Sequence, residues 1–196
     1  MSARDVRTED RWYEITDETA APSPQVLIFP ERVTRNIRSA IRSVGGAERL
    51  RPHVKTHKSR DVVRLHLDEG ISKFKCSTLS EATMLVDAGA SDVLIAYQLV
   101  GPNQAILCDM IRRFPGTRFA CLVDNADTVT ALEREGQTAD VQITVYIDLD
   151  VGMHRTGIVP GDDALELYRK TARSTVLIAG GLHAYDGHIH DSDVSQ

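Results

Sequence analysis

The chain has 196 residues, enough to bury a substantial core in one domain or in two small ones. Its 23 basic and 28 acidic residues give a net charge of −5, which argues against a nucleic-acid surface, because such surfaces need clustered lysine and arginine. Its three cysteines are widely spaced, so neither a disulfide framework nor a zinc site is indicated, and a reducing cytoplasm fits best. No stretch approaches the roughly eighteen apolar residues of a membrane span, and the N-terminus has no apolar signal segment, so we expect neither membrane insertion nor secretion.

Residues 1–24 are charged and then turn-forming, so we expect an N-terminal arm without chemistry, followed by one domain over residues 25–196. The domain opens with an expected strand at Val26–Phe29. Apolar residues then recur at helical spacing over Glu31–Val44. These two segments form a first strand–helix unit.

After this unit, strand-like segments alternate with helical ones at a period of about 20 to 25 residues. The expected strands are Leu50–Lys55, Ile71–Ser77, Asp92–Tyr97, Arg118–Val123, Gln142–Asp150 and Val176–Tyr185. The expected helices are Ser59–Leu67, Leu79–Ala88, one beginning after Pro102, Asn125–Glu135 and about Asp162–Ala172. This alternation predicts parallel βαβ units, and nearly continuous apolar runs indicate strands covered on both faces. The predicted fold class is therefore α/β with a parallel sheet.

The glycine signatures that bind nucleotides in open α/β sheets are absent from the sequence, which favours a parallel (β/α) barrel. Barrel enzymes carry their active sites at the C-terminal ends of the strands. Polar side chains stand at six successive expected strand ends: Lys55 and His57, Cys76 and Ser77, Tyr97 and Gln98, Asp124 and Asn125, Asp148 to Arg155, and His183 to His188. We expect these side chains to surround one site.

The segment RPHVKTHKS, Arg51–Ser59, combines strand-like apolar residues with several cations. If it is extended, His53 and Lys55 point to one face, while Pro52 and Val54 point to the other. Neighbouring cations and partial burial disfavour the charged form of a lysine, which leaves more free amine for attack on a carbonyl. We therefore predict a Schiff-base lysine at Lys55, and a solvated basic turn is the alternative.

The segment DLDVGMHRTG, Asp148–Gly157, crowds carboxylates, an imidazole and a guanidinium between two glycines. Gly152 and Gly157 allow sharp turns and close approach of a ligand to the backbone. Arg155 can donate two hydrogen bonds to an anionic or phenolic oxygen. The alternative is an Asp–Arg ion pair that only holds the loop.

The segment GLHAYDGHIHD, Gly181–Asp191, follows the last expected strand. In its extended part, Gly181, His183 and Tyr185 alternate onto one face, where Tyr185 can lie against a flat ring. Its imidazoles and carboxylates are His183, Asp186, His188, His190 and Asp191. They resemble a loose divalent-metal site, but their spacing is irregular, so we assign no metal ligand within the chain.

With these stretches placed, residues 26–191 resemble the alanine racemase-like N-terminal barrel of fold-type III pyridoxal-phosphate enzymes, and most closely the D-threonine aldolase and D-serine dehydratase group. RPHVKTHKS resembles the group's cofactor-lysine motif, which implies that Lys55 binds pyridoxal 5'-phosphate covalently and that His53 belongs to the cofactor site. The segment Phe74–Pro102 resembles the next two βα units.

Two further motifs carry the same resemblance. DVGMHRTG resembles the loop whose arginine, Arg155 here, hydrogen-bonds near the cofactor's phenolic oxygen. AYDGH resembles the segment whose aromatic residue, Tyr185, lies against the pyridine ring and whose histidine, His188, faces the substrate.

Members of this group are about twice as long as this chain. The resemblance implies that two further barrel strands supply much of the phosphate cradle. It also implies that a C-terminal β-domain brings the ligands of a divalent metal (Mn, Mg or Zn) and part of a homodimer interface. Six strands cannot close an eight-stranded barrel, so we expect an incomplete barrel. Because the elements that would anchor the cofactor's phosphate are not in this chain, we also expect weak cofactor affinity.

The activity implied is aldol cleavage of β-hydroxy-D-amino acids such as D-threonine to glycine and an aldehyde, with Lys55 and His188 as catalytic residues. The alternatives on the same fold are a D-serine dehydratase or an amino-acid racemase. A third alternative is a pyridoxal-phosphate-binding protein or fragment without turnover. The expected partner is a small-molecule D-amino acid, and no nucleic acid or membrane is expected to bind.

Overall fold

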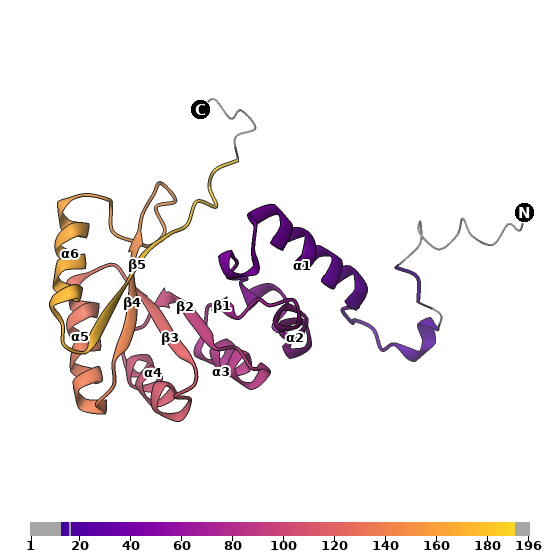
Figure 1. Ribbon diagram of the computed structural model, residues 1–196, viewed down its shortest axis with the longest axis horizontal. Helices are drawn as coiled ribbons and strands as arrows, with labels where there is room; N and C mark the ends of the chain where they lie inside the picture. The colour runs from indigo at the N-terminus through magenta and orange to yellow at the C-terminus, as the bar shows by residue number, and fades with distance from the viewer. Residues whose placement is uncertain (1–12, 16, 191–196) are drawn as a thin grey trace, which may run out of the picture.

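The computed structural model of the protein describes residues 13–15 and 17–190. Within them, a five-stranded parallel sheet has the strand order β1-β2-β3-β4-β5 (Figure 1). The strands are β1 Lys73–Cys76, β2 Asp92–Gln98, β3 Arg118–Val123, β4 Ile143–Leu149 and β5 Leu177–Ala184. The α-helices are α1 Pro30–Val44, α2 Arg60–Asp68, α3 Leu79–Ala88, α4 Pro102–Arg113, α5 Ala126–Ala139 and α6 Asp162–Arg173.

The strand order follows the chain, and the helices pack on one side of the sheet. The main core cluster joins helix residues such as Leu85, Leu107 and Leu132 to the strand residues that face them. The opposite face carries a small apolar cluster made by strand residues, with Leu94 and Leu122 at its centre. A doubly wound sheet would reverse its strand order and carry helices on both faces. The prediction of an incomplete parallel barrel is therefore confirmed, since the sheet is not closed.

The first expected strand, Val26–Phe29, is wrong. No strand pairing of the described residues involves this segment, and the Val26 side chain is 85% exposed. An isolated extended segment gains no ladder of hydrogen bonds and buries no apolar face, so apolar composition alone does not make it a strand.

The expected strand Leu50–Lys55 is also wrong, so the described sheet has five strands after the arm rather than six. The segment makes one parallel bridge, between His53 and Lys75, where Lys75 N donates to Pro52 O over 2.8 Å. Pro52 has no N–H and cannot extend the ladder. A 3₁₀ turn over Val54–Thr56 follows. The other five expected strands are confirmed to within two residues at each end.

Helix caps stand directly after the strand ends. Thr78 follows β1 closely and accepts a hydrogen bond from Glu81 N, and Asn125 follows β3 and accepts one from Thr128 N over 2.8 Å. Such caps satisfy the free N–H groups of the first helical turn. The connections after β1 and β3 are therefore short, and side chains at the strand ends are brought to one rim of the sheet.

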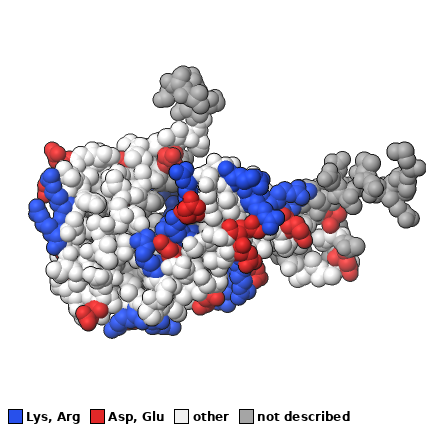
Figure 2. Space-filling view, viewed as in Figure 1, with Lys and Arg blue, Asp and Glu red and all other residues white. Residues whose placement is uncertain are grey.

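Charged side chains of both signs are interspersed on the face seen in Figure 2. On the inner face of the sheet, Arg51 donates to Asp92 over 2.6 Å and Arg118 to the same carboxylate over 3.0 Å. Arg51 therefore stabilises the N-terminal end of the strands and does not belong to the rim formed by their C-terminal ends.

Among the described residues, no helix combines the length and apolar character that crossing a membrane requires.

The packing of α5 gives a stability prediction. Leu132 is completely buried, so Leu132→Ala is expected to lower the free energy of unfolding by about 2–5 kcal/mol through lost burial and a residual cavity. The matched control is Leu165→Ala on α6, where the side chain is 45% exposed and the expected change is within about 0.5 kcal/mol. Urea unfolding of the two variants and the wild type measures the difference, and equal losses would contradict this core.

Candidate active site

A hollow of about 190 Å³ lies at the C-terminal ends of the strands. Its lining residues are His53, Lys55, Lys75, Ser77, Ala96, Tyr97, Arg155, His183 and Tyr185. Four of the five predicted site residues, all except His188, border it. They come from the turn after Pro52, from the loop after β4 and from the end of β5, so tertiary structure brings together what the sequence separates.

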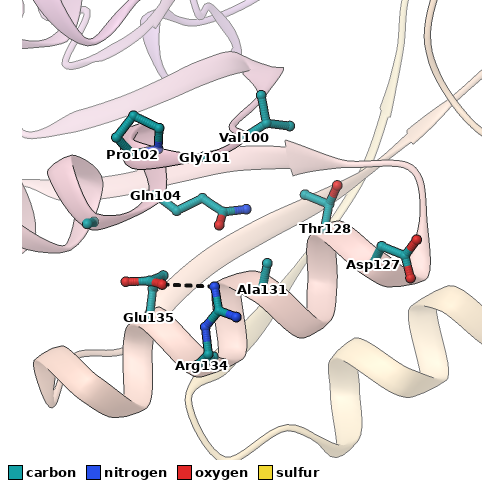
Figure 3. A pocket seen from close by; sticks show the side chains of 10 residues that line it. Val100, Gly101, Pro102, Gln104, Asp127, Thr128, Ala131, Arg134 and Glu135 are labelled. Atoms are coloured by element: carbon teal, nitrogen blue, oxygen red, sulfur yellow. Dashed lines mark hydrogen bonds and ion pairs between the residues drawn. The ribbon is translucent and has the colours of Figure 1, made fainter.

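A larger groove of about 490 Å³ lies between α4 and α5 (Figure 3). Three of its polar side chains are already engaged, since Arg134 pairs with Glu135 at 3.2 Å and Gln104 donates to Leu99 O over 2.9 Å. The hollow, by contrast, gathers amines, imidazoles and a guanidinium. We therefore place the candidate site in the hollow.

Lys55 lies in the 3₁₀ turn with an exposed side chain. Its backbone N–H donates to His53 Nδ1 over 3.3 Å, and its carbonyl accepts from Lys58 Nζ over 2.7 Å. Among the described residues, none forms a hydrogen bond or an ion pair with Lys55 Nζ. The amine is thus held at the hollow by its backbone and left free to react.

His53 lies near both lysines of the hollow, and its imidazole is neutral. Burial, followed by the charges of Lys75 and Lys55, lowers the pKa of His53 from 6.5 to about 4. Its Nδ1 accepts from the Lys55 backbone, so the ring proton belongs on Nε2, which lies 3.2 Å from Ser77 Oγ. The ring fixes the Lys55 turn without adding a charge.

Lys75 is the site residue that sequence reasoning missed. It alternates on β1 with the buried Phe74 and Cys76, so its side chain faces the hollow. Burial lowers the pKa of Lys75, the positive charge of Lys55 adds to this, and Asp148 opposes it. The signal was present in KFKC, because a cation on every second residue of a strand marks a polar inner face. Cys76, noted at the same strand end, faces the core instead, and burial raises its pKa to about 12.

The buried Asp148 pairs with the partly buried His183 on the neighbouring strand. His183 Nδ1 lies 2.6 Å from Asp148 Oδ1, while Asp148 Oδ2 accepts from Gln98 Nε2 at 2.9 Å and Thr156 Oγ1 at 3.0 Å. Burial raises the pKa of Asp148, but the three hydrogen bonds outweigh it and hold that pKa below its usual range. The carboxylate is therefore ionised and acts only as an acceptor.

The loop after β4 is anchored to the same network. Asp124 Oδ2 accepts from Gln98 Nε2 over 2.8 Å and from Gly157 N over 3.1 Å. Gly157 has φ of +103°, and a Cβ there would lie 2.6 Å from Asp150 N. Only glycine fits without displacement of the loop.

Arg155 stands on this loop with its guanidinium 4.8 Å from the centre of the Tyr185 ring. The Asp150 carboxylate on this loop is hydrogen-bonded to other groups. It accepts from Gly152 N, His154 N and His154 Nδ1 at 2.8–3.0 Å. These bonds, that of His154 N first, lower the pKa of Asp150 to about 2. The alternative of an Asp–Arg ion pair is therefore wrong for the described residues, and Arg155 is free to meet a ligand.

His188 does not border the hollow. Its side chain is exposed, and a Cβ placed on Gly152 would lie 2.8 Å from His188 Nε2, so the ring lies against that turn. Among residues 13–15 and 17–190, no group of three or more His, Cys, Asp or Glu side chains is arranged to hold a metal ion. Asp191, the last member of the loose cluster, lies outside the described residues.

Comparison with known proteins places this chain in a family. Residues 28–195 match the family described as alanine racemase, N-terminal domain. The chain belongs to this family. It is 34% identical to D-threonine aldolase of Arthrobacter sp., over 71% of this chain and 36% of that protein. It is 30% identical to D-threo-3-hydroxyaspartate dehydratase of Delftia sp. strain HT23, over 89% of this chain and 46% of that protein.

A solved structure agrees with the sequence comparison. The crystal structure of D-threonine aldolase from Filomicrobium marinum superposes with a TM-score of 0.79 at 29% identity, over 86% of this chain and 45% of that one. The chain spans less than half the length of each of these relatives. The residues that line the hollow, from His53 to Tyr185, lie within the range 28–195 that matches the family.

The Gly157 turn gives the first prediction for the site. Gly157→Ala is expected to destabilise the fold by about 1–3 kcal/mol, because both φ and the contact with the Asp150 backbone oppose a side chain. Gly161→Ala is the control, since a Cβ there meets no atom within 4 Å. Urea unfolding compares the two, and a Gly157 variant as stable as the Gly161 variant would show that the turn is not built as described.

His53 gives a prediction about pH. Its folded pKa of about 4 lies below the ordinary 6.5, so between these values the unfolded chain binds a proton that the folded chain does not. Its contribution to stability is therefore present above pH 6.5 and is lost as the pH falls towards 4. Urea unfolding at several pH values should show a shallower loss for His53→Gln than for the wild type. An NMR titration midpoint near 6.5 for His53 would contradict the burial.

Proposed function

We propose that the protein is a pyridoxal-phosphate-dependent lyase that cleaves β-hydroxy-D-amino acids such as D-threonine to glycine and an aldehyde. The observation that carries the proposal is the free Lys55 amine at a hollow shared with Arg155 and Tyr185. Relatives named D-threonine aldolase and 3-hydroxy-D-aspartate aldolase support it. Relatives named dehydratase keep elimination of water as the second candidate.

The residues of the hollow fit pyridoxal 5'-phosphate. Lys55 offers an amine to the cofactor's aldehyde, Arg155 offers a guanidinium to its phenolic oxygen, and His183 Nε2 is a buried atom that lacks a partner within the described residues. When bound, the cofactor supplies an electron sink for the charge that develops at Cα. A divalent metal is implied by the family resemblance, but no cluster of described residues fits one, so no step is assigned to it.

Each side chain around the hollow has its own proposed role. Lys55 would hold the cofactor through its free amine, while the neutral His53 keeps the Lys55 turn in place. The Arg155 guanidinium lies against the Tyr185 ring, so each restricts the other at the mouth of the hollow. His188 remains a predicted contributor to proton transfer, and its exposed ring lies beside the Gly152 turn. The homodimer and the cytoplasmic location also remain predictions.

Replacement of the lysine tests the proposal. Lys55→Ala is expected to abolish the covalent adduct that borohydride traps between pyridoxal 5'-phosphate and the protein, because the reacting amine is removed. Lys58→Ala is the control from the same turn, since Lys58 Nζ is engaged by Glu81 at 3.3 Å. Peptide mass spectrometry locates the adduct, and an adduct that persists in Lys55→Ala would rule out the assignment.

The reaction itself is identified by its products. Glycine with an aldehyde indicates aldol cleavage, a keto acid with ammonia indicates dehydration, and the opposite enantiomer indicates racemisation. A chain that forms the adduct and leaves every D-amino acid unchanged would be a cofactor-binding protein without turnover.

A further inference from the structure

His183 Nε2 is a buried polar atom without a hydrogen-bond partner among the described residues. The ring borders the hollow, and it is also part of a narrower pocket with Leu122, Met153 and Thr156. Burial of a polar atom without a partner is unfavourable, so native structures usually supply one from protein, water or ligand. Because the His183 ring lines the hollow, an occupant of the hollow is the nearest candidate partner for Nε2.

The protonation of the ring follows from its neighbour. Asp148 is ionised and accepts all three of its hydrogen bonds, so His183 Nδ1 must carry a proton to donate at 2.6 Å. A neutral imidazole with its proton on Nδ1 has a lone pair on Nε2. In its neutral form His183 therefore presents an acceptor on Nε2, and the Asp148 carboxylate can stabilise the imidazolium that forms when Nε2 takes a proton.

Lys75 presents the complementary group to the same hollow. Its ammonium is partly buried, and it forms no hydrogen bond or ion pair with the described residues. It lies close enough to Asp148 to feel that charge, although the carboxylate oxygens are already occupied by other donors. One unpaired donor and one unpaired acceptor therefore stand at the hollow.

We propose that Lys75 and His183 together bind a hydroxyl group of the ligand, with the Lys75 ammonium donating to the hydroxyl oxygen and His183 Nε2 accepting the hydroxyl proton. A hydroxyl fits because it is both donor and acceptor, whereas a carboxylate or phosphate oxygen would meet the Nε2 lone pair without a proton. The β-hydroxyl of the substrate and the ring hydroxyl of the cofactor share this chemistry. The identity of the ligand in this inference rests on the proposed function, whereas the hydroxyl site itself does not.

If the group is the substrate's β-hydroxyl, His183 is the base of the cleavage. The O–H proton passes to Nε2, the C–O bond becomes a carbonyl, and the Cα–Cβ bond breaks with its electron pair left on Cα. The imidazolium returns its proton to Cα, so the products are an aldehyde and glycine and the atoms balance. Lys75 stabilises the oxygen while it loses its proton.

The experiment uses the chain labelled with ¹⁵N-histidine, and NMR reads the two ring nitrogens of His183. Without ligand, Nδ1 is expected to carry the proton and Nε2 to be bare. A shift of the Nε2 signal on addition of pyridoxal 5'-phosphate alone identifies the ring hydroxyl. A shift that needs a β-hydroxy-D-amino acid, and that D-alanine does not produce, identifies the β-hydroxyl. A protonated Nε2 in the free protein, or an Nε2 signal that neither ligand moves, overturns the proposal.

Variants supply a second, independent measure. His183→Gln and Lys75→Met are expected to lower kcat by about 100-fold with little change in KM if the β-hydroxyl binds here. They are expected to weaken cofactor binding by about tenfold if the ring hydroxyl does. Lys75→Arg should restore part of the loss because it keeps the donor. Wild-type behaviour of both His183→Gln and Lys75→Met overturns the proposal.

Matched controls separate this result from general effects. Lys73→Met removes a lysine from the same face of β1 that does not border the hollow, and His190→Gln removes an exposed histidine. Both should behave as wild type, and urea unfolding checks that His183→Gln still folds. If Lys55 traps no cofactor while a β-hydroxy-D-amino acid still moves the Nε2 signal, the proposed function fails and the hydroxyl site stands.

Discussion

The Asp148 carboxylate is the point on which the rim of the sheet depends. It stands at the end of β4 and accepts hydrogen bonds from β2 through Gln98, from β5 through His183 and from the loop after β4 through Thr156. A buried carboxylate without such donors would be strongly unfavourable as an ion, and here three donors offset the loss of solvation. The same bonds that keep the charge also fix the spacing of three neighbouring segments.

The hollow around this carboxylate carries more positive than negative charge. Lys55, Lys75 and Arg155 border it, while His53 stays neutral because burial and the two lysines oppose its protonation. Like charges held together in a partly enclosed space raise the free energy of the empty site and favour an anionic or electron-rich ligand. The electrostatics and the free Lys55 amine thus suit the same kind of occupant.

Family membership and site geometry answer different questions. The match over residues 28–195 and the superposition on a D-threonine aldolase establish the fold and its ancestry. Aldolases, dehydratases and a racemase all occur among the relatives, so the reaction depends on which groups meet the substrate. We propose that in this chain those groups include Lys75 and His183, which line one hollow and whose side-chain donor and acceptor have no partner among the described residues.

The sequence by itself determined the parallel α/β architecture, because apolar strands alternated with capped helices, and it indicated Lys55, Arg155 and Tyr185 through their dense local motifs. It could not determine whether Val26–Phe29 pairs with another strand, since pairing depends on a partner elsewhere in the chain. Tertiary structure alone decided that Lys75 turns towards Lys55 and that Asp148 pairs with His183, which lies 35 residues away. The physical reason is that local periodicity sets which face a side chain takes, whereas the curvature and register of the assembled sheet decide which faces meet.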